Sequence, residues 1–438
     1  MSDLTRLEDA QRIIREALSV LGTESISLLD AWGRILAEDI VAERDHPPWD
    51  NSAMDGFAVR HEDIAGAQTP VGASEAPAMP GRARGTGASE SLPRGVRPPA
   101  HIVLTIVENV AAGTFPTKIV GRGEAIRIMT GAPIPQGADT IVKVEDTEQT
   151  PTAVTIFKAE PKGAYIRPQG EDLRQGDCIM ATGTTIRPAE AGMLATLARS
   201  FVLVSKKPRV AILATGDELA DIDEPLTEEK IVNANSYSLA AAVQEAGGLP
   251  ILLGIAKDNP DDLKAKIGQG QAMGADMLVL SGGVSMGDYD FTKPVFQELS
   301  GAMHFWKLAI RPGQPVAFGT IGATPTFGLP GNPVSSMVTF EQLVRPAILM
   351  MCGSLMPARP VVRAVFQERF TKSSDRRHFL RGILWMENGL LMVRTTGRQG
   401  SGLLTSMVKA NGLIDVPVAV EQLNPGDVVD VQVLGGWH

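Results

Sequence analysis

Residues 275–290, which read ADMLVLSGGVSMGDYD, constrain the fold of this chain more than any other segment. The short apolar run 275–280 predicts a buried strand. The glycines after it allow backbone N–H groups to approach a ligand that a Cβ atom would block. Asp288 and Asp290 then add negative charge, and a divalent cation would join such acids to a bound anion. Taken alone, the segment is equally compatible with an ordinary strand-to-helix turn that ends in capping acids.

The region around this segment alternates between strand and helix patterns. Strands are expected at 209–214, 249–256, 275–280 and 325–329, and helices at 235–246, from 260 onward, at 292–299 and at 337–350, the last bent or ended near Pro346. This alternation predicts a doubly wound, mostly parallel α/β domain.

The remaining segments have other patterns. After residue 360 the chain reads as strands with a hairpin at Asn388-Gly389, which predicts a small antiparallel barrel. Towards the N-terminus, helical spacing is expected at 4–21, 28–41 and 188–204, and short β-like runs at 102–107 and 138–144. Residues 66–100 are rich in Pro, Gly, Ala, Ser and Arg, which predicts a loop or a disordered insert.

Composition limits the class of protein. A length of 438 residues predicts several domains, and a net charge of −9 argues against a broad nucleic-acid-binding face. Two cysteines, Cys178 and Cys352, exclude a disulfide scaffold and a cysteine-built metal site. No apolar run reaches membrane-spanning length, and the acidic start has no signal-peptide core. We therefore expect a cytoplasmic enzyme or binding protein with no nucleic-acid or membrane partner.

Acidic side chains follow three of the expected parallel strands. Glu218, Asp258 and Asp290 each come after a strand end, where doubly wound sheets bind their ligands. A single acid at such a place is usually a helix cap, but acids after consecutive strands favour a cation site. Oxygen ligands favour magnesium, which retains water molecules and bridges phosphates.

Two further segments carry candidate anion contacts. The loop GLPGNPVSS at 328–336 follows a strand and begins a helix, so its free N–H groups favour an anion; a rigid capping turn is the alternative. It lacks the GK[ST] ending of a Walker A loop. Lys307 and Arg311 are four residues apart, which in one strand places both on one face; a solvated strand edge is the alternative.

The first half of the chain contains polar turns at 47–59, 127–133 and 167–172, each of which alone is compatible with a structural role. The six histidines are scattered, and no Ser-His-Asp or Cys-His arrangement supports nucleophilic hydrolysis.

Together these segments resemble a known family. The shared motifs, in chain order, are PPWDNSAMDGFAVR, RIMTGAPIPQGAD, IRPQGED, ATGDEL, SGGVSMGDYDFTK, KLAIRPGQP, GLPGNPVSS and GSGLLTSMVKANGL. The chain resembles the molybdopterin molybdenumtransferases, the MoeA family, to which the E domain of gephyrin also belongs. The motifs cover nearly the whole chain, and jointly they are highly specific.

The resemblance implies a multidomain α/β plus β fold in four parts and a homodimer. The parts are an elongated helical dimerisation subdomain (1–45 and 177–207), an inserted β-rich subdomain (46–176), the α/β molybdopterin-binding domain (208–355) and the C-terminal β-barrel (356–438). In this family the active cleft lies between the second part of one chain and the third and fourth parts of its partner.

The resemblance also implies a reaction, namely the insertion of molybdate into adenylylated molybdopterin with magnesium-dependent cleavage of the phosphoanhydride and release of AMP. It implies catalytic roles for Glu218, Asp258, Asp290, Lys307 and Arg311, with magnesium at the three acids. The implied substrate-binding residues are Asp55, Thr130, Arg167, Asp172, Ser281, Gly282, Gly283, Pro330, Gly331, Pro333 and Ser335. A molybdopterin adenylyltransferase and acceptor molybdoenzymes are implied as further partners.

Two features depart from the family pattern. Gln314 stands where the family often has a second basic residue, so we expect a weaker or uncharged contact there. Residues 66–100 are longer than the family leads us to expect. Two other functions remain open at this point: a related nucleotide phosphoanhydride hydrolase, and a gephyrin-like scaffold. The preference for molybdate or tungstate also remains open.

Overall fold

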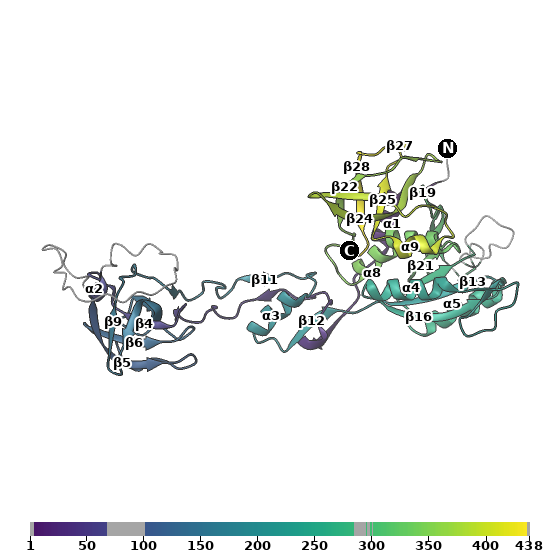
Figure 1. Ribbon diagram of the computed structural model, residues 1–438. Coiled ribbons are helices and arrows are strands. Elements are labelled where there is room, and N and C mark those ends of the chain that lie inside the picture. Colours follow the sequence, from purple (N-terminus) through teal and green to yellow (C-terminus); the bar gives the residue numbers. More distant parts are fainter. Residues whose placement is uncertain (1–3, 68–100, 284–294, 296–297, 300, 436–438) are drawn as a thin grey trace. The chain divides into compact units, whose positions relative to one another are not determined.

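The computed structural model describes residues 4–67, 101–283, 295, 298–299 and 301–435. The chain forms two compact units, one of Met1–Asp39 with Met180–His438 and the other of Ile40–Ile179 (Figure 1). Asp288, Asp290, nearly all of the expected insert at 66–100 and most of the expected helix at 292–299 lie outside the described residues.

The first unit contains the expected α/β sheet. Four strands are parallel, namely β13 (Arg209–Thr215), β16 (Leu249–Ala256), β17 (Met277–Ser281) and β21 (Thr324–Leu329), whereas β18 (Ala302–Lys307) and β20 (Pro315–Ile321) add an antiparallel edge. The strand order is β16-β13-β17-β21-β20-β18. The expectation of a mostly parallel sheet is therefore confirmed.

Helices cover both faces of this sheet. Val210 and Ile212 of β13 pack in one core with α4 (Ala234–Glu245), α7 (Pro333–Thr339) and α8 (Arg345–Met351), whereas Ala211 and Leu213 pack in a second core with α5 (Pro260–Ala272). Successive side chains of a strand point to opposite faces, so this alternation produces a doubly wound domain. The side chain of Asn259 caps α5 by accepting a hydrogen bond from the N–H of Asp262 at 2.9 Å.

The helical run after β21 passes Pro346 and ends at Met351. A π-helical segment, η3 (Phe340–Val344), ends two residues before Pro346. Proline has no N–H to donate to the carbonyl group four residues earlier, that of Gln342. The Gln11 side chain of α1 (Leu7–Ala17) donates to this carbonyl instead, at 3.0 Å. A neighbouring helix thus satisfies the acceptor that the proline leaves free, and the chain remains helical as far as Met351.

Of the helical expectations at 28–41 and 188–204, the first is wrong and the second holds only for its first half. Residues 28–41 form only the short 3-10 helix η1 (Leu28–Asp30) and then an extended chain as far as β2 (Ile40–Val41), because Gly33, with φ of +74°, ends the turn. Residues 188–204 form α3 (Pro188–Thr196) and then β12 (Phe201–Ser205), which pairs with β1 (Thr23–Ser27). In β12 the β-branched residues Val202 and Val204 are buried alternately, which is a strand pattern.

The C-terminal region forms the expected barrel, which is closed but not wholly antiparallel, because 365–366 and 392–393 pair in parallel. Its strands are β22 (Val361–Phe366), β24 (Arg377–Glu387), β25 (Leu390–Thr395), β26 (Gly412–Val416) and β28 (Val428–Val433). The ring closes because β24 pairs with both β25 and β26. Asn388 and Gly389 both have positive φ in the β24–β25 turn, which confirms the expected hairpin. The short pair β23 (Phe370–Thr371) and β27 (Gln422–Leu423) and the helix α9 (Leu404–Lys409) complete the region.

The second unit is rich in strands. Its six-stranded sheet has the order β7-β4-β6-β5-β9-β8, formed by β4 (Gly56–Val59), β5 (Ile102–Val110), β6 (Glu124–Ile128), β7 (Thr140–Lys143), β8 (Thr147–Gln149) and β9 (Ala153–Ile156). Smaller elements are β3 (Asn51–Ser52) with β10 (Ile166–Arg167), β11 (Cys178–Met180), α2 (His61–Ile64) and η2 (Val144–Asp146). Both expected β-runs, 102–107 and 138–144, are strands.

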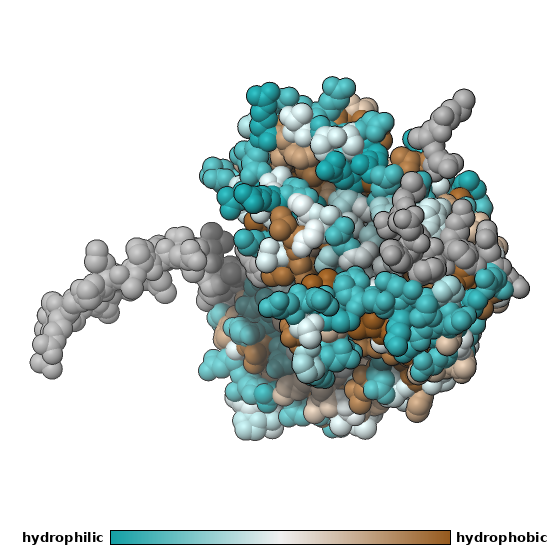
Figure 2. Space-filling model, turned by 90° about the vertical axis from the view of Figure 1, so that its right-hand side faces the viewer, coloured by the Kyte–Doolittle hydropathy of each residue, from teal (hydrophilic) through white to brown (hydrophobic). Residues whose placement is uncertain are grey.

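Among the described helices, none combines the length and the apolar character that crossing a membrane requires. On the face of the molecule seen in Figure 2, hydrophobic residues occur in small groups between hydrophilic ones.

Candidate functional site

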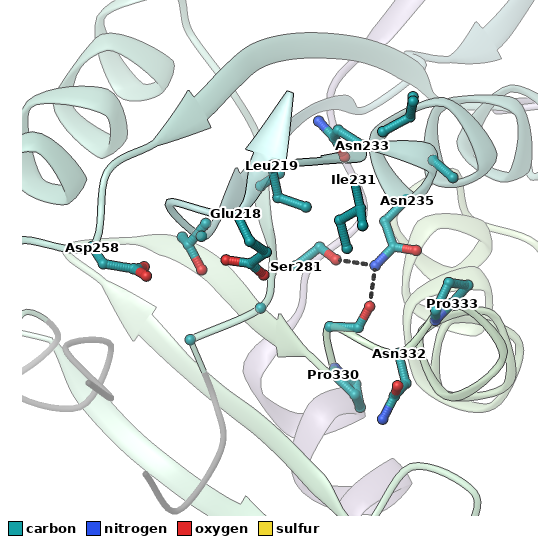
Figure 3. Close-up of a pocket in the computed structure, with 18 of the residues that line it drawn as sticks. Glu218, Leu219, Ile231, Asn233, Asn235, Asp258, Ser281, Pro330, Asn332 and Pro333 are labelled. Atoms are coloured by element: carbon teal, nitrogen blue, oxygen red, sulfur yellow. Dashed lines mark hydrogen bonds between the residues drawn. The ribbon is translucent and has the colours of Figure 1, made fainter. Parts of the chain in front are cut away.

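A cavity of about 510 Å³ lies at the carboxyl ends of β13, β17 and β21 (Figure 3). Its size is within the range of small-molecule sites, and its position is that of ligand sites in doubly wound sheets. Eight residues predicted from the sequence line it together: Glu218, Asp258, Ser281, Gly282, Gly283, Pro330, Gly331 and Pro333. The structure thus brings together loops that are more than a hundred residues apart in the chain.

Two glycines make the close approach of these loops possible. Gly282 has φ of +95°, and a Cβ atom on it would lie 2.6 Å from the carbonyl oxygen of Thr215. Gly216 has φ of +144°, and a Cβ atom there would lie 2.5 Å from Oε2 of Glu218. Any side chain at either position would force the neighbouring group to move, so the turns after β13 and β17 require glycine.

Two reciprocal hydrogen bonds, each from a backbone N–H to a carboxylate oxygen, join the loops of the acidic wall. The N–H of Asp217 donates to Asp258 and the N–H of Asp258 donates to Asp217, each at 3.2 Å. The loop after Asp217 continues into β14 (Leu219–Ala220), which pairs with β15 (Ile231–Val232), and the ammonium group of Lys230 donates to the Asp217 carbonyl. These bonds join the loop of Asp258 to the loop that carries Glu218, and both residues line the cavity.

Two carboxylates fit a magnesium ion that also binds phosphate oxygens and water. The described residues contain no group of three or more His, Cys, Asp or Glu side chains that could hold a metal without such help. The third expected acid, Asp290, lies outside the described residues.

The opposite wall is built from Asn235, Ser281 and Gly331. Asn235 lies at the start of α4, and its Nδ2 atom donates to Oγ of Ser281 and to the carbonyl oxygen of Gly331, both at 2.8 Å (Figure 3). The side chain of Asn233 caps the same helix by accepting from the N–H of Ser236. Sequence reasoning missed both asparagines because it treated residue 235 as an ordinary first helical residue, although an Asn-rich helix start after a strand is a usable signal.

Lys307 and Arg311 do not share a strand, so this expectation is wrong. Lys307 ends β18 of the α/β sheet, whereas Arg311 belongs to β19 (Ile310–Arg311), which pairs with β24 of the barrel. The chain leaves the sheet between them because the N–H of Ala309 donates to Thr5 and that of Leu308 to Gln314. Neither basic residue lines the cavity, and neither does Ser335, which is buried in α7.

A group of positive charges surrounds Arg311. His378 lies opposite Arg311 in the β19–β24 pairing and is buried, and Arg376 donates a hydrogen bond to Gln314. Burial, together with the charges of Arg311, Lys372 and Arg376, lowers the pKa of His378 to about 4. The uncharged Gln314 is thus hydrogen-bonded to the guanidinium group of Arg376, a contact that the sequence did not predict.

The other predicted residues lie in the second unit. Arg167 and Asp172 line one cavity of about 540 Å³. Asp55 and Thr130 are hydrogen-bonded to each other, because Oδ1 of Asp55 accepts from the N–H and the hydroxyl of Thr130, both at 2.7 Å. These two bonds hold the pKa of Asp55 below its usual value. The turns at 47–59 and 127–133 are therefore in contact. Part of the turn at 167–172 lines the same cavity as His46.

Three family models match this chain along nearly its full length. They describe the MoeA N-terminal region (domain I and II) at residues 5–198, a probable molybdopterin binding domain at 211–350, and the MoeA C-terminal region (domain IV) at 363–434. The chain belongs to the MoeA family. Membership makes it a transferase enzyme of molybdenum cofactor biosynthesis.

Individual MoeA relatives agree with this assignment over most of their length. The chain is 34% identical to molybdopterin molybdenumtransferase 1 of Mycobacterium tuberculosis, and the match covers 98% of each chain. It is also 34% identical to the molybdopterin molybdenumtransferase of a Nostoc species, with 94% of this chain and 89% of the relative covered. A crystal structure of the molybdopterin biosynthesis MoeA protein from Pyrococcus horikoshii matches with a TM-score of 0.79 and 28% identity, covering 98% of this chain and 100% of the other.

Proposed function

We propose that the chain inserts molybdate into adenylylated molybdopterin, with magnesium-dependent cleavage of the phosphoanhydride and release of AMP, and that it does so in the cytoplasm. The observation that carries this proposal is the composition of the cavity at the ends of β13, β17 and β21. One wall presents two carboxylates, and the facing loops present glycine turns and a hydroxyl group. Such a site suits a phosphate-containing ligand that binds together with a cation.

Glu218 and Asp258 would hold the magnesium ion. When bound, magnesium would neutralise the negative charge of the phosphate, which the two carboxylates would otherwise repel. Ser281 and the loop of Pro330 and Gly331 face the same space and would bind the phosphate oxygens by hydrogen bonds. We assign Asp290 to the same magnesium site on the family resemblance alone.

Arg311, with Arg376 and Lys372 near it, would attract the anionic reactants, since clustered positive charge raises the local concentration of anions. We assign Lys307 and Ser335 no direct contact with a ligand in this cavity, because neither lines it. In the second unit, Arg167 and Asp172 would bind substrate within their own cavity, beside the pair Asp55 and Thr130.

The proposal includes a homodimer in which each site uses residues of both chains. It is tested by mixing an Asp55→Ala variant with a Glu218→Ala variant under conditions in which subunits exchange. Recovery of part of the activity is expected, because one of the two sites in a mixed dimer retains both residues. Absence of recovery despite measured exchange would show that each chain has a complete site of its own.

The reaction is tested by reconstitution from purified components. The protein is incubated with adenylylated molybdopterin, molybdate and magnesium, and the product is assayed by activation of a molybdenum-free acceptor molybdoenzyme. We expect activation that requires all three additions and that chelation of magnesium abolishes. AMP release without molybdenum insertion would favour the phosphoanhydride hydrolase, and neither AMP release nor insertion would favour the scaffold.

A further inference from the structure

Asn235 joins the two loops that face the acidic wall of the cavity. This residue is 9% exposed and lines the cavity at the start of α4. Ser281 ends β17, and Gly331 follows β21, the neighbouring parallel strand. Because one Nδ2 atom donates to both residues, Asn235 connects the ends of two adjacent strands to a third element (Figure 3).

The orientation of the Asn235 amide follows from its partners. A backbone carbonyl oxygen can only accept a hydrogen bond, so the group that faces Gly331 must be the NH₂ end of the amide. The second hydrogen of the same NH₂ group then points to Oγ of Ser281 at 2.8 Å. Both amide hydrogens are therefore used, and the oxygen of Ser281 must accept.

This arrangement determines what the Ser281 hydroxyl can do. A hydroxyl group has one hydrogen to donate, and that hydrogen rotates to suit its surroundings. Within the described residues, the Ser281 side chain makes no hydrogen bond other than the one it accepts from Asn235. Ser281 is 2% exposed and lines the cavity, so its hydrogen is available to a ligand there.

We infer that Asn235 is a positioning residue that makes Ser281 a hydrogen-bond donor into the cavity. The ligand group that binds the Ser281 hydrogen is then an acceptor, such as a phosphate oxygen. This inference rests on the proposed function, since it assigns a phosphate oxygen to one point of the same site. It adds a residue, Asn235, for which neither the sequence motifs nor the acidic wall gives a role.

The contact with Gly331 supports the same role. The carbonyl of Gly331 is held towards Asn235, and the position of a Cβ atom on Gly331 would be 3.7 Å from Cα of Gly282. The loops after β17 and β21 therefore lie close together, and the N–H of Gly282 donates to the carbonyl oxygen of Leu329 at 3.0 Å. Asn235 fixes both at the point where they meet, which limits the positions that the Ser281 hydroxyl can take.

A double-mutant cycle tests this inference without requiring turnover. Inorganic pyrophosphate in magnesium buffer is the probe, and its affinity is measured by isothermal titration calorimetry on the full chain. Ser281→Ala is expected to weaken binding by about 10- to 100-fold, the range for a hydrogen bond to a charged group. Asn235→Ala is expected to weaken it by about 10-fold in the unchanged protein but by about 3-fold or less when Ser281 is already alanine.

Two further variants separate this role from a loss of stability. Asn411→Ala removes two hydrogen bonds to the backbone of Leu384 in the barrel, at 2.6 and 2.9 Å, at a residue that does not line the cavity, and is expected to lower the melting temperature with unchanged pyrophosphate affinity. Asn235→Asp keeps the size of the side chain but replaces the donor by an acceptor that would capture the Ser281 hydrogen. It is expected to weaken binding at least as much as Ser281→Ala does, and it provides the test if Asn235→Ala does not fold.

The inference is overturned if Asn235→Ala causes the same fold-loss in both backgrounds, if Asn235→Asp binds as the unchanged protein does, or if the unchanged protein does not bind pyrophosphate. Failure of the proposed function would give a different result. The reconstitution would then yield no molybdenum insertion, whereas pyrophosphate binding would still depend on the Asn235–Ser281 pair.

Discussion

The buried histidine beside Arg311 should make the barrel sensitive to acid. His378 is 2% exposed, its Nε2 atom lies 2.9 Å from Oγ of Ser374, and Arg311 is its partner in the β19–β24 pairing. Its pKa is lowered from 6.5 to about 4 by burial and by the neighbouring positive charges. Between these two pH values the unfolded chain binds a proton at this position and the folded chain does not. The stability that neutral His378 contributes is therefore present at neutral pH and is lost as the pH falls towards 4.

The size of the effect follows from the shift. Each pH unit of this window is worth about 1.4 kcal/mol, so lowering the pH from about 7 to about 4.5 should reduce the free energy of unfolding by about 2.5 kcal/mol through this residue alone. A His378→Gln variant lacks the pH-dependent contribution of the histidine to the free energy of unfolding, whereas all other ionisable groups contribute in both proteins. The difference in stability between the two proteins should change by that amount over this range.

Hydrogen exchange of the β24 amides is the suitable assay, because it reports opening of the barrel separately from the rest of a multidomain chain. An imidazole titration followed by NMR gives the pKa directly. Equal acid sensitivity of the two proteins, or a His378 midpoint near 6.5, would refute the electrostatic reasoning.

Three further predictions concern the candidate site itself. Glu218→Gln and Asp258→Asn should each fold normally and lower molybdenum insertion by about 10- to 100-fold, with part of the loss recovered at high magnesium; full activity of both variants at low magnesium would contradict the cation site. Thr130→Val should raise the pKa of Asp55 towards its ordinary value, because one of its two donors is lost, and an unchanged carboxyl titration by NMR would disprove that cause. Gly282→Ala should lower both the melting temperature and pyrophosphate affinity, since its Cβ would collide with the backbone of β13; unchanged values of both would show that the turn tolerates a side chain.

Local patterns were sufficient to predict the α/β sheet and the barrel. The apolar run 275–280 and the turn Asn388-Gly389 fix their own conformations through burial and turn geometry, and the structure confirms both. The convergence of Glu218 and Asp258 was also predictable, because parallel strands place their carboxyl ends at one edge. Such rules need no knowledge of distant contacts.

Other features depend on contacts that no local pattern contains. The segment 28–41 has helical spacing, yet its backbone pairs with distant strands after Gly33 ends the turn. Arg311 leaves the sheet of Lys307 because β24, more than sixty residues later, offers it a partner. The role of Asn235 likewise depends on Ser281 and Gly331, which lie about 46 and 96 positions further along the chain. Tertiary pairing decides these cases, and it overrides local propensity.

The central claim is that cleavage of the phosphoanhydride is coupled to molybdate insertion at the cavity of Glu218, Asp258 and Ser281. The most direct test measures AMP release and molybdenum insertion in the same reconstituted reaction, with and without molybdate. We predict that the two products form in equal amounts, that omission of molybdate suppresses both, and that Glu218→Gln lowers both together. AMP release that continues at the same rate without molybdate, or insertion that survives the loss of Glu218, would contradict the account.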